Sequence, residues 1–348
     1  MTFTYEGGFY GAGMTTENDT MRALVQRSRG GPSGLTLQDD YPRPTAPGPG
    51  DYLVRVEAAG VNFADVMQSR GTYGGGPEVP YVAGFEAAGE IIAAGVDVED
   101  PHPVGTHVIG AGRGAFAEHM TMPAAAGVLP VPSGWSDAEA LGLVLNWATA
   151  LAALRPLGEI AHGDVVLIHA AAGGVGQAAV RIARHYGAQV IATASPAKHG
   201  IVRSLGVDTV LDADRPDLAA EIIRRSGGVD LVLESVGKKT FATSLSVTKP
   251  FTGRIVVLGA ASGEASLTTH DLVFSHPVQI KGLHLGALAD AARPVFRGLL
   301  DEIQELIDQG VYAPCTPHVH PLHEGPTVLR AVASGTTHGK HALDPWWC

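Results

Sequence analysis

The segment from Val165 to Gly176 limits the fold of this chain more than any other part of the sequence. It reads VVLIHAAAGGVG, so a short run of valine, leucine and isoleucine leads directly into a turn of small residues, and a helical stretch follows to Tyr186. Ala171, Gly173 and Gly176 have the spacing of the G-x-G-x-x-G dinucleotide fingerprint, with alanine in the first position. The second glycine lets the backbone approach a pyrophosphate, and the third lets the helix pack against the strand. The segment therefore predicts the first strand, turn and helix of a nucleotide-binding sheet.

Five more short apolar runs follow, separated by intervals that helices can fill. The six predicted strands cover residues 164–169, 189–193, 209–212, 230–234, 254–258 and 279–283, and the predicted helices cover 175–187, 197–205 and 215–226. Strands this rich in Val, Ile and Leu are typical of parallel sheets that helices cover on both faces. The alternation predicts a Rossmann doubly wound parallel sheet. In this context the alternative interpretation of the glycines, a tight turn that binds no ligand, is less favoured.

The residues after the second strand of this sheet indicate which dinucleotide it binds. An acidic residue there would bind the ribose 2′-hydroxyl of NAD. Here the strand is followed by Ser195, and Lys198, His199 and Arg203 come soon after. Serine and basic side chains suit a 2′-phosphate, so the sequence predicts NADPH as the cofactor. The alternative is that Lys198 only solvates the start of a helix.

The chain outside this sheet has a different texture. Residues 1–20 are polar and rich in glycine, and we expect them to form a flexible N-terminal tail. From 21 to 146, strand-like runs such as 51–57 and 106–110 alternate with Pro and Gly, which predicts an all-β, barrel-like part. After 286 we expect a helix over 291–309, a short strand, and a second helix over 324–334.

Composition excludes several classes of function. Asp and Glu outnumber Lys and Arg by 35 to 24, so the formal charge is −11 and the field of the whole protein repels nucleic acid. Cys315 and Cys348 are too few for a disulfide framework or a four-thiolate zinc site. The N-terminus lacks the pattern of a signal peptide, and no apolar run approaches the length of a membrane span. We expect a soluble, cytoplasmic protein with no nucleic-acid or membrane partner.

Motifs along the chain resemble the medium-chain dehydrogenase/reductase superfamily, in its zinc-independent quinone oxidoreductase (zeta-crystallin-like) family. In family order they are AGVNFAD at 59–65, GTY at 71–73, GFEAAG at 84–89, NWAT at 146–149, the glycine-rich turn, ESVG at 234–237 and GK at 339–340. The resemblance implies an α/β protein with a GroES-like β-barrel catalytic domain at 21–146, a Rossmann NADPH-binding domain at 147–286, and a return to the catalytic domain at 287–348. It also implies a homodimer.

The site implied by the resemblance lies in the cleft between the two domains. Asn62 and Asp65 match residues that line the nicotinamide end, and Tyr73 is the candidate proton donor because its phenol can donate to a developing oxyanion. The implied cofactor-binding residues are Asn146, Thr149, Ala172, Gly173, Gly174, Val175, Gly176, Ser195, Lys198, Gly237, Gly259 and Lys340, the last near the phosphates. Structural roles stay open for Asn62 in a turn, for Thr149 in a helix and for Tyr73 at the cleft rim.

The expected chemistry follows from residues that cannot bind zinc. Zinc-dependent relatives carry cysteine and histidine ligands at the positions of Asn62 and Phe85. Oxidation of an alcohol needs a stabilised alkoxide, which Zn²⁺ supplies as a Lewis acid. Hydride addition to an enone or quinone instead leaves charge on an oxygen that hydrogen-bond donors can stabilise. The sequence therefore favours hydride transfer from NADPH to a quinone or α,β-unsaturated carbonyl, with no metal.

Two other functions stay open. An enoyl-thioester reductase performs the same hydride addition on an acyl-carrier or coenzyme A substrate, but it needs basic groups for the pantetheine phosphate, and few besides Arg70 flank the stretch from Asn62 to Tyr73. A non-catalytic NADPH-binding protein is the second alternative, because Met67 replaces a tyrosine that is common in the family.

Three further features carry less weight. The run with His318, His320 and His323 could ligate a metal, although it matches the final strand of the family. Cys315 has no basic surroundings that would make it a nucleophile. The pair of tryptophans at 346 and 347 fits either a dimer contact or disorder.

Overall fold

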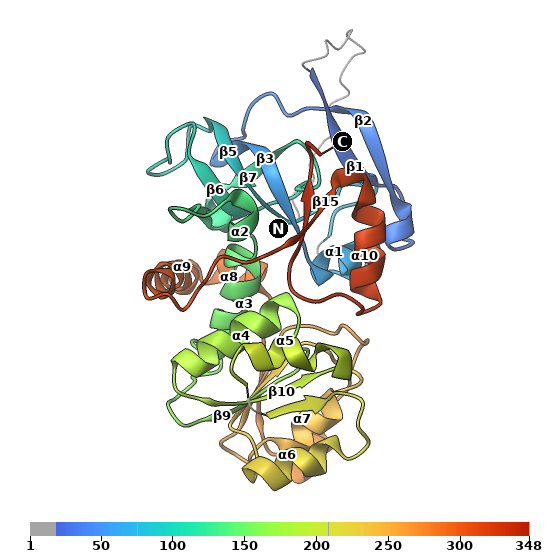
Figure 1. Ribbon diagram of the computed structural model, residues 1–348, viewed down its shortest axis with the longest axis vertical. Coiled ribbons are helices and arrows are strands. Elements are labelled where there is room, and N and C mark those ends of the chain that lie inside the picture. Colours follow the sequence, from blue (N-terminus) through green and yellow to red (C-terminus); the bar gives the residue numbers. More distant parts are fainter. Residues whose placement is uncertain (1–18, 75, 208, 348) are drawn as a thin grey trace.

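The structure is a computed structural model that describes residues 19–74, 76–207 and 209–347. Figure 1 shows a β-rich half at the top and a helix-covered parallel sheet at the bottom, and the C-terminal strands lie in the upper half. We call these the β-rich half and the parallel-sheet half. The predicted tail, residues 1–20, lies outside the described residues apart from its last two, and Thr20 already begins a strand.

The β-rich half is made of apolar strands separated by Gly and Pro. Its strands are β1 Thr20–Gln26, β2 Leu35–Pro42, β3 Asp51–Val61, β4 Tyr81–Val82, β5 Glu86–Ala94, β6 His107–Ala111, β7 His119–Pro123 and β8 Val128–Pro130, with helices α1 Phe63–Ser69 and α2 Asp137–Ala140. Strand β3 pairs antiparallel with β5 and β7, over a core that includes Val54, Ile91 and Phe116. Gly89 permits this pairing, because a Cβ there would lie 2.0 Å from the Arg55 carbonyl oxygen.

Within the described residues, the parallel-sheet half has six strands in the order β11-β10-β9-β12-β13-β14. They are β9 Val165–Ile168, β10 Gln189–Ala194, β11 Thr209–Asp212, β12 Leu231–Glu234, β13 Arg254–Val257 and β14 Gln279–Gly282. The helices of this half are α3 Ala148–Leu154, α4 Gly174–His185, α5 His199–Ser204, α6 Leu218–Ser226 and α7 Phe241–Val247. The six predicted strands are confirmed to within a residue at each end. The strand order reverses between β9 and β12, and ligands of doubly wound sheets bind in the crevice at such a reversal.

The side chains of β9 show why helices cover both faces of this sheet. Val166 and Ile168 belong to the core that contains α3 and α4, whereas Leu167 belongs to the opposite core with Ile222 and Leu245. Successive side chains of a strand point to opposite faces, so a continuous apolar run needs cover on both sides. Each such side chain contributes about 1.5–3 kcal/mol when it is fully buried.

The C-terminal segment returns to the β-rich half. Helices α8 Leu285–Ala291 and α9 Arg293–Asp308 precede β15 His318–Pro321, α10 Gly325–Ala333 and β16 His341–Asp344. Strand β16 pairs in parallel with β15 and antiparallel with β3, so the end of the chain completes the sheet of the β-rich half. Across the residues that the structure describes, no helix has both the length and the apolar character to cross a membrane.

Trp346 packs against the strand that precedes the candidate site. Its indole Nε1 donates to the Val56 carbonyl oxygen at 2.7 Å, and the Arg55 guanidinium lies 4.9 Å from the ring centroid. The sequence left disorder or a dimer contact open for the two terminal tryptophans. In the structure Trp346 makes these intramolecular contacts, and Trp347 is about half exposed, at 51%.

Candidate active site

A buried lysine joins three separate segments where the two halves meet. The Lys340 ammonium donates to Asn62 Oδ1 at 2.9 Å, to Asn146 Oδ1 at 3.1 Å, and to Glu86 Oε2. Asn62 is the N-cap of α1, Glu86 begins β5, and Asn146 lies in a π-helical turn at Leu143–Trp147. A lysine has three N–H donors, so each one has an acceptor within the described residues. The lysine therefore holds these segments in a fixed arrangement.

Glu86 is the anion that makes this buried cation stable. It is fully buried, its Oε1 accepts from the Gly142 backbone N–H at 2.8 Å, and its Oε2 accepts from Asn62 Nδ2 at 3.2 Å. Removing one partner of a buried ion pair costs about 3–5 kcal/mol, because the other charge is left without a partner. Glu86 was not predicted as a site residue. Its signal was a carboxylate that begins a largely apolar strand.

Asn62 and Asp65 cap helix α1 reciprocally. Asp65 Oδ2 accepts from the Asn62 backbone N–H at 2.7 Å, and the Asn62 side chain caps the first turn in return. Asp65 is buried, and its Oδ1 has no hydrogen-bond partner among the described residues. Burial is the main cause that raises the pKa of Asp65 to about 7, while the Asn62 N–H and Lys340 lower it and Glu86 raises it. This carboxyl is therefore partly protonated at neutral pH.

Tyr73 lies where segments from both halves approach each other. Its ring centroid is 5.2 Å from that of Phe85 and 5.4 Å from that of His284, which follows β14. Burial raises the pKa of the Tyr73 phenol, and Asp65 raises it further. The phenol thus stays protonated at neutral pH and can donate. His284 was not predicted, because a single histidine in a loop carries no sequence signal.

The two glycines of the fingerprint differ in the space around them. Gly173 is the N-cap of α4. A Cβ on Gly176 would lie 2.5 Å from the Ala170 carbonyl oxygen, whereas a Cβ on Gly173 would meet its nearest neighbour at 3.4 Å. Gly176 is therefore needed for the packing of helix on strand, and Gly173 leaves an open approach to the helix N-terminus.

The glycine-rich turn also contacts the residues around Lys340. The Gly339 backbone N–H donates to the Ala172 carbonyl oxygen at 3.2 Å, and Asn146 Oδ1 would lie 2.9 Å from a Cβ on Gly174. Asn146 Nδ2 donates in turn to Asn62 Oδ1 at 3.0 Å. The structure thus brings the predicted turn, Asn62, Asn146 and the end of the chain into one place.

The remaining predicted cofactor residues lie around the same edge of the sheet. Ser195 and Lys198 follow β10, and Lys198 Nζ donates to the Gly335 carbonyl oxygen at 2.6 Å. Partial burial lowers the pKa of Lys198. The other residues are half-buried or buried and come from α3, α4 and the loops after β12 and β13: Thr149, Val175, Gly237 and Gly259.

The histidines near the C-terminus form a stack. The ring of His318 stacks on His338 at 5.2 Å and on His341 at 5.0 Å, and His320 Nε2 lies 3.1 Å from His341 Nδ1. Among the described residues, no group of three or more His, Cys, Asp or Glu side chains has an arrangement that could hold a metal ion. The metal interpretation of this run therefore has no support in the geometry.

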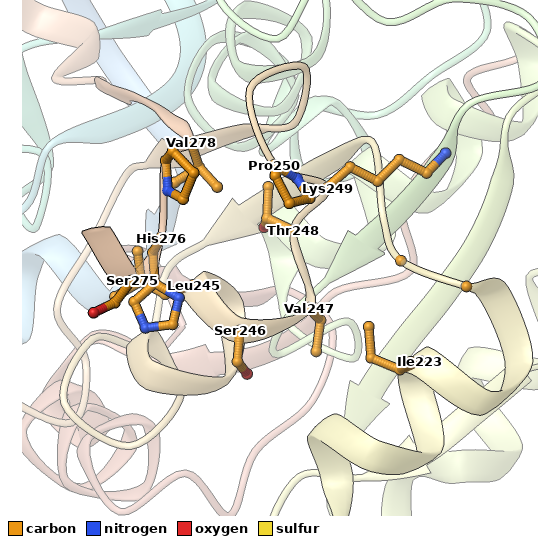
Figure 2. A pocket seen from close by; sticks show the side chains of 13 residues that line it. Ile223, Leu245, Ser246, Val247, Thr248, Lys249, Pro250, Ser275, His276 and Val278 are labelled. Carbon is orange, nitrogen blue, oxygen red and sulfur yellow. The ribbon is translucent and has the colours of Figure 1, made fainter. Parts of the chain in front are cut away.

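A separate pocket of about 130 Å³ lies at the opposite end of the parallel sheet. Figure 2 shows that Val247, Pro250 and Val278 line it, together with Ser246 and His276. These residues precede strands or end α7, whereas the glycine-rich turn follows β9. This pocket is therefore distinct from the candidate site.

Comparisons with known proteins identify the family. Residues 48–133 match the alcohol dehydrogenase GroES-like domain, and residues 174–305 match the family described as zinc-binding dehydrogenase. The human synaptic vesicle membrane protein VAT-1 homolog is 32% identical over 345 residues, which covers 93% of this chain and 86% of that protein. Escherichia coli quinone oxidoreductase complexed with NADPH has a TM-score of 0.86 and 26% identity, over 93% of this chain and 100% of that one. CurK enoyl reductase has a TM-score of 0.84 and 30% identity, over 94% and 99% of the two chains.

A GroES-like half and a doubly wound sheet that meet at a glycine-rich turn define a two-domain dehydrogenase/reductase fold. The chain belongs to the medium-chain dehydrogenase/reductase superfamily, in the zinc-independent quinone oxidoreductase family. The fold class and the resemblance that the sequence predicted are both confirmed.

A pair of glycine variants separates packing from ligand approach. We expect Gly176→Ala to lower the free energy of unfolding by more than about 2 kcal/mol, because its Cβ would overlap backbone atoms. We expect Gly173→Ala to change stability by less than about 1 kcal/mol but to weaken dinucleotide binding, because its Cβ occupies the open approach. Urea denaturation and NADPH titration of both variants check this. Tight binding by Gly173→Ala would contradict it.

The raised pKa of Asp65 predicts a pH-dependent stability difference. The folded pKa, about 7, lies above the ordinary value of 3.8 for an aspartate, so the folded state retains a proton that the unfolded state has lost between these pH values. Stability from this group is therefore lost as pH rises through that window. Relative to Asp65→Asn, wild-type protein should lose about 2–4 kcal/mol of unfolding free energy between pH ~4 and pH ~8. Parallel urea titrations across that range measure it, and a constant difference would rule the raised pKa out.

Proposed function

We propose that the chain is an NADPH-dependent reductase that transfers hydride, without zinc, to a quinone or α,β-unsaturated carbonyl. The observation that carries the proposal is the contact between the glycine-rich turn and the polar cluster at Asn62. Asn146 bridges the two, because it lies against Gly174 and its Nδ2 donates to Asn62 Oδ1 at 3.0 Å. A nucleotide held at the turn is thereby presented to the side chains of the β-rich half. Asn62 and Phe85 stand where zinc-dependent relatives carry metal ligands, and neither side chain suits zinc.

The residues at the turn fit a dinucleotide. The first N–H groups of α4 have no partner inside the helix, and they point toward the open approach at Gly173. Ser195 and Lys198 would hold the 2′-phosphate, which requires the Lys198 ammonium to share or leave the Gly335 carbonyl. Further contacts would come from Asn146, Thr149, Ala172, Gly174, Val175, Gly176, Gly237 and Gly259. When bound, NADPH supplies the hydride from its nicotinamide ring.

Side chains of the protein would stabilise the negative charge that hydride addition creates and would supply the proton. Hydride addition to the β-carbon moves the alkene electrons onto the carbonyl oxygen, and the resulting enolate or phenolate needs a donor. Tyr73 would donate its phenolic proton, which burial retains on the oxygen, and would regain one from solvent. Asp65 and Asn62 would line the same end of the site.

Lys340 would act by holding other residues in place. Its three donors are engaged by Asn62, Asn146 and Glu86 in the described part of the chain, so a contact with a cofactor phosphate requires one of these bonds to be exchanged. The amide of Asn62 accepts from both Lys340 and Asn146, which fixes its orientation.

An enoyl-thioester reductase is the second candidate. The similarity to CurK enoyl reductase favours it, as does a second basic residue near the site. Arg29, which the sequence did not associate with this region, lies beside Gly71, where a Cβ would be 2.8 Å from Arg29 Cδ. Together with Arg70 it offers positive charge for a pantetheine phosphate, although Arg29 also pairs with Glu78 at 3.1 Å.

One assay tests the activity and its cofactor. Purified protein is mixed with NADPH or NADH and with quinones, enones or enoyl thioesters, and nicotinamide absorbance is followed. We expect NADPH to be preferred by about tenfold or more, quinones or enones to be reduced, and a chelator to leave the rate unchanged. Tyr73→Phe should lower kcat by about 10- to 100-fold if the phenol is the proton donor.

Each contrary result of this assay removes a specific assignment. Equal rates with NADH and NADPH would remove the roles of Ser195 and Lys198. Loss of activity with chelator, restored by zinc, would overturn the metal-free reaction. A preference for thioesters would favour the second candidate, and NADPH binding without oxidation by any acceptor would indicate a non-catalytic binding protein.

We further propose that the chain forms a homodimer through strand β14. Among the described strands β14 pairs only with β13, so its other edge is available for pairing. Large apolar side chains are exposed next to it, namely Phe251 at 76%, Val273 at 62% and Phe274 at 75%. Phe251 is tied to this edge because its backbone N–H donates to the Pro277 carbonyl oxygen at 2.5 Å.

Charge placed at this edge should separate the subunits. We expect Phe274→Glu to shift the protein from dimer to monomer in sedimentation equilibrium, because a carboxylate is costly in an apolar interface. Val96→Glu is the matched control, since Val96 is 89% exposed on the β-rich half. A monomeric wild-type protein, or a dimer that survives Phe274→Glu, would argue against an interface at β14.

A further inference from the structure

Two buried polar residues end the strands that flank the reversal of the parallel sheet. Glu234 is the last residue of β12, and His169 directly follows β9. Both side chains are fully buried, and their nearest nitrogen and oxygen atoms are 3.9 Å apart. The crevice between β9 and β12 is where doubly wound sheets bind their ligands. Neither side chain has a role in the reaction derived above.

A continuous chain of hydrogen bonds connects these residues. His169 Nδ1 lies 2.9 Å from Thr193 Oγ1 on β10, and His169 Nε2 lies 3.1 Å from Ser244 Oγ on α7. Ser244 Oγ donates to Glu234 Oε2 at 2.6 Å. Thr193, His169, Ser244 and Glu234 are all buried. Three adjacent strands and one helix are therefore joined at the carboxyl edge of the sheet.

When Glu234 is ionised, each hydrogen bond in this hydrogen-bond chain can have only one direction. The carboxylate accepts only, so Ser244 donates to it and must itself accept from His169 Nε2–H. Burial lowers the pKa of His169, which keeps the ring neutral. His169 Nδ1 then carries no proton and accepts from the Thr193 hydroxyl. The chain therefore fixes a single histidine tautomer.

The other oxygen of Glu234 holds the loop that faces the crevice. Glu234 Oε1 accepts from the backbone N–H of Val236 at 2.8 Å, from that of Gly237 at 2.9 Å, and from Thr240 Oγ1 at 2.7 Å. The Val236 carbonyl oxygen accepts from the Ser262 N–H at 2.7 Å, which ties the loop after β13 to the same segment. The position of both loops thus depends on one carboxylate.

We propose that the hydrogen-bond chain from Thr193 through His169 and Ser244 to Glu234 is a positioning device that holds the Val236–Gly237 loop in the conformation that binds the cofactor. The inference rests on the proposed NADPH-dependent function. These residues do not touch the reacting atoms. They act through the loop, so their loss should weaken cofactor binding more than it slows the chemical step.

Ser244→Ala removes the hydroxyl that links His169 to Glu234, so it interrupts the hydrogen-bond chain at its centre and removes only one small group. We expect NADPH, titrated into the apoprotein by calorimetry, to bind about tenfold more weakly, while kcat at saturating NADPH changes less than about twofold. Ser246→Ala is the matched control, because Ser246 lies on the same helix, is exposed, and donates only to the Thr243 carbonyl oxygen at 3.0 Å among the described contacts. It should bind NADPH as the wild type does.

Glu234→Gln is the second variant, and it keeps the shape of the side chain. Its amide can donate to Ser244, and Ser244 then donates to His169 Nε2. The direction of each hydrogen bond is thereby reversed, and the His169 proton moves from Nε2 to Nδ1. Nitrogen-15 NMR of the apoproteins, with His169→Gln to assign the signal, reports this tautomer without any cofactor. We expect an Nε2–H ring in the wild type, an Nδ1–H ring in Glu234→Gln, and weaker NADPH binding by Glu234→Gln.

The outcomes distinguish this inference from the proposed function. A wild-type protein that does not bind NADPH would overturn the function and, with it, the role of the loop. If Ser244→Ala and Glu234→Gln bind NADPH as tightly as the wild type and only their melting temperatures are lower, the hydrogen-bond chain has a structural role alone. An Nδ1–H ring in the wild-type apoprotein would contradict the assigned order of donors. If Ser244→Ala does not fold, Glu234→Gln decides the question alone.

Discussion

The ion pair between Lys340 and Glu86 is the interaction on which the candidate site depends. The two residues are 254 positions apart, and Asn62 and Asn146 complete the cluster from two further segments. A buried ammonium without an acceptor would cost several kcal/mol, so the C-terminal return, β5 and the start of α1 stabilise one another where they meet. The same cluster contacts Gly174, which ties the glycine-rich turn to the β-rich half. The contacts that join the two halves are therefore also contacts of the candidate site.

Several of the buried polar groups lie at the candidate site and at the carboxyl edge of the parallel sheet. The apolar cores on both faces of the parallel sheet hold Val, Leu, Ile and Ala, whereas the carboxyl edge holds His169, Ser244 and Glu234. Each buried carboxylate has its own set of donors, except that one oxygen of Asp65 has none among the described residues. That exception also has the raised pKa. Burial without full hydrogen bonding is how a protein prepares a carboxyl group for proton chemistry.

Local patterns in the sequence were enough to predict the parallel sheet but not the cluster at Lys340. The six strands could be predicted because each is a short apolar run between helices, and the turn because Gly173 and Gly176 have a fixed spacing. Glu86, His284 and Ser244 were missed as site residues. Their roles come from neighbours far along the chain: Glu86 from Lys340, His284 from Tyr73, and Ser244 from His169. No spacing rule links such pairs, because the distance between them is set by the packing of separate elements.

The sequence by itself determined the family, the fold class and the residue types at the former zinc positions, since Asn62 and Phe85 are the same whatever their surroundings. Only the tertiary structure decided what these residue types can do. In the structure all three donors of Lys340 have protein acceptors, the Lys198 ammonium donates to the Gly335 carbonyl oxygen, and Asp65 is buried. The physical reason is that periodicity is a property of neighbours along the chain. Protonation and donor availability instead depend on desolvation and on charges that the fold brings near.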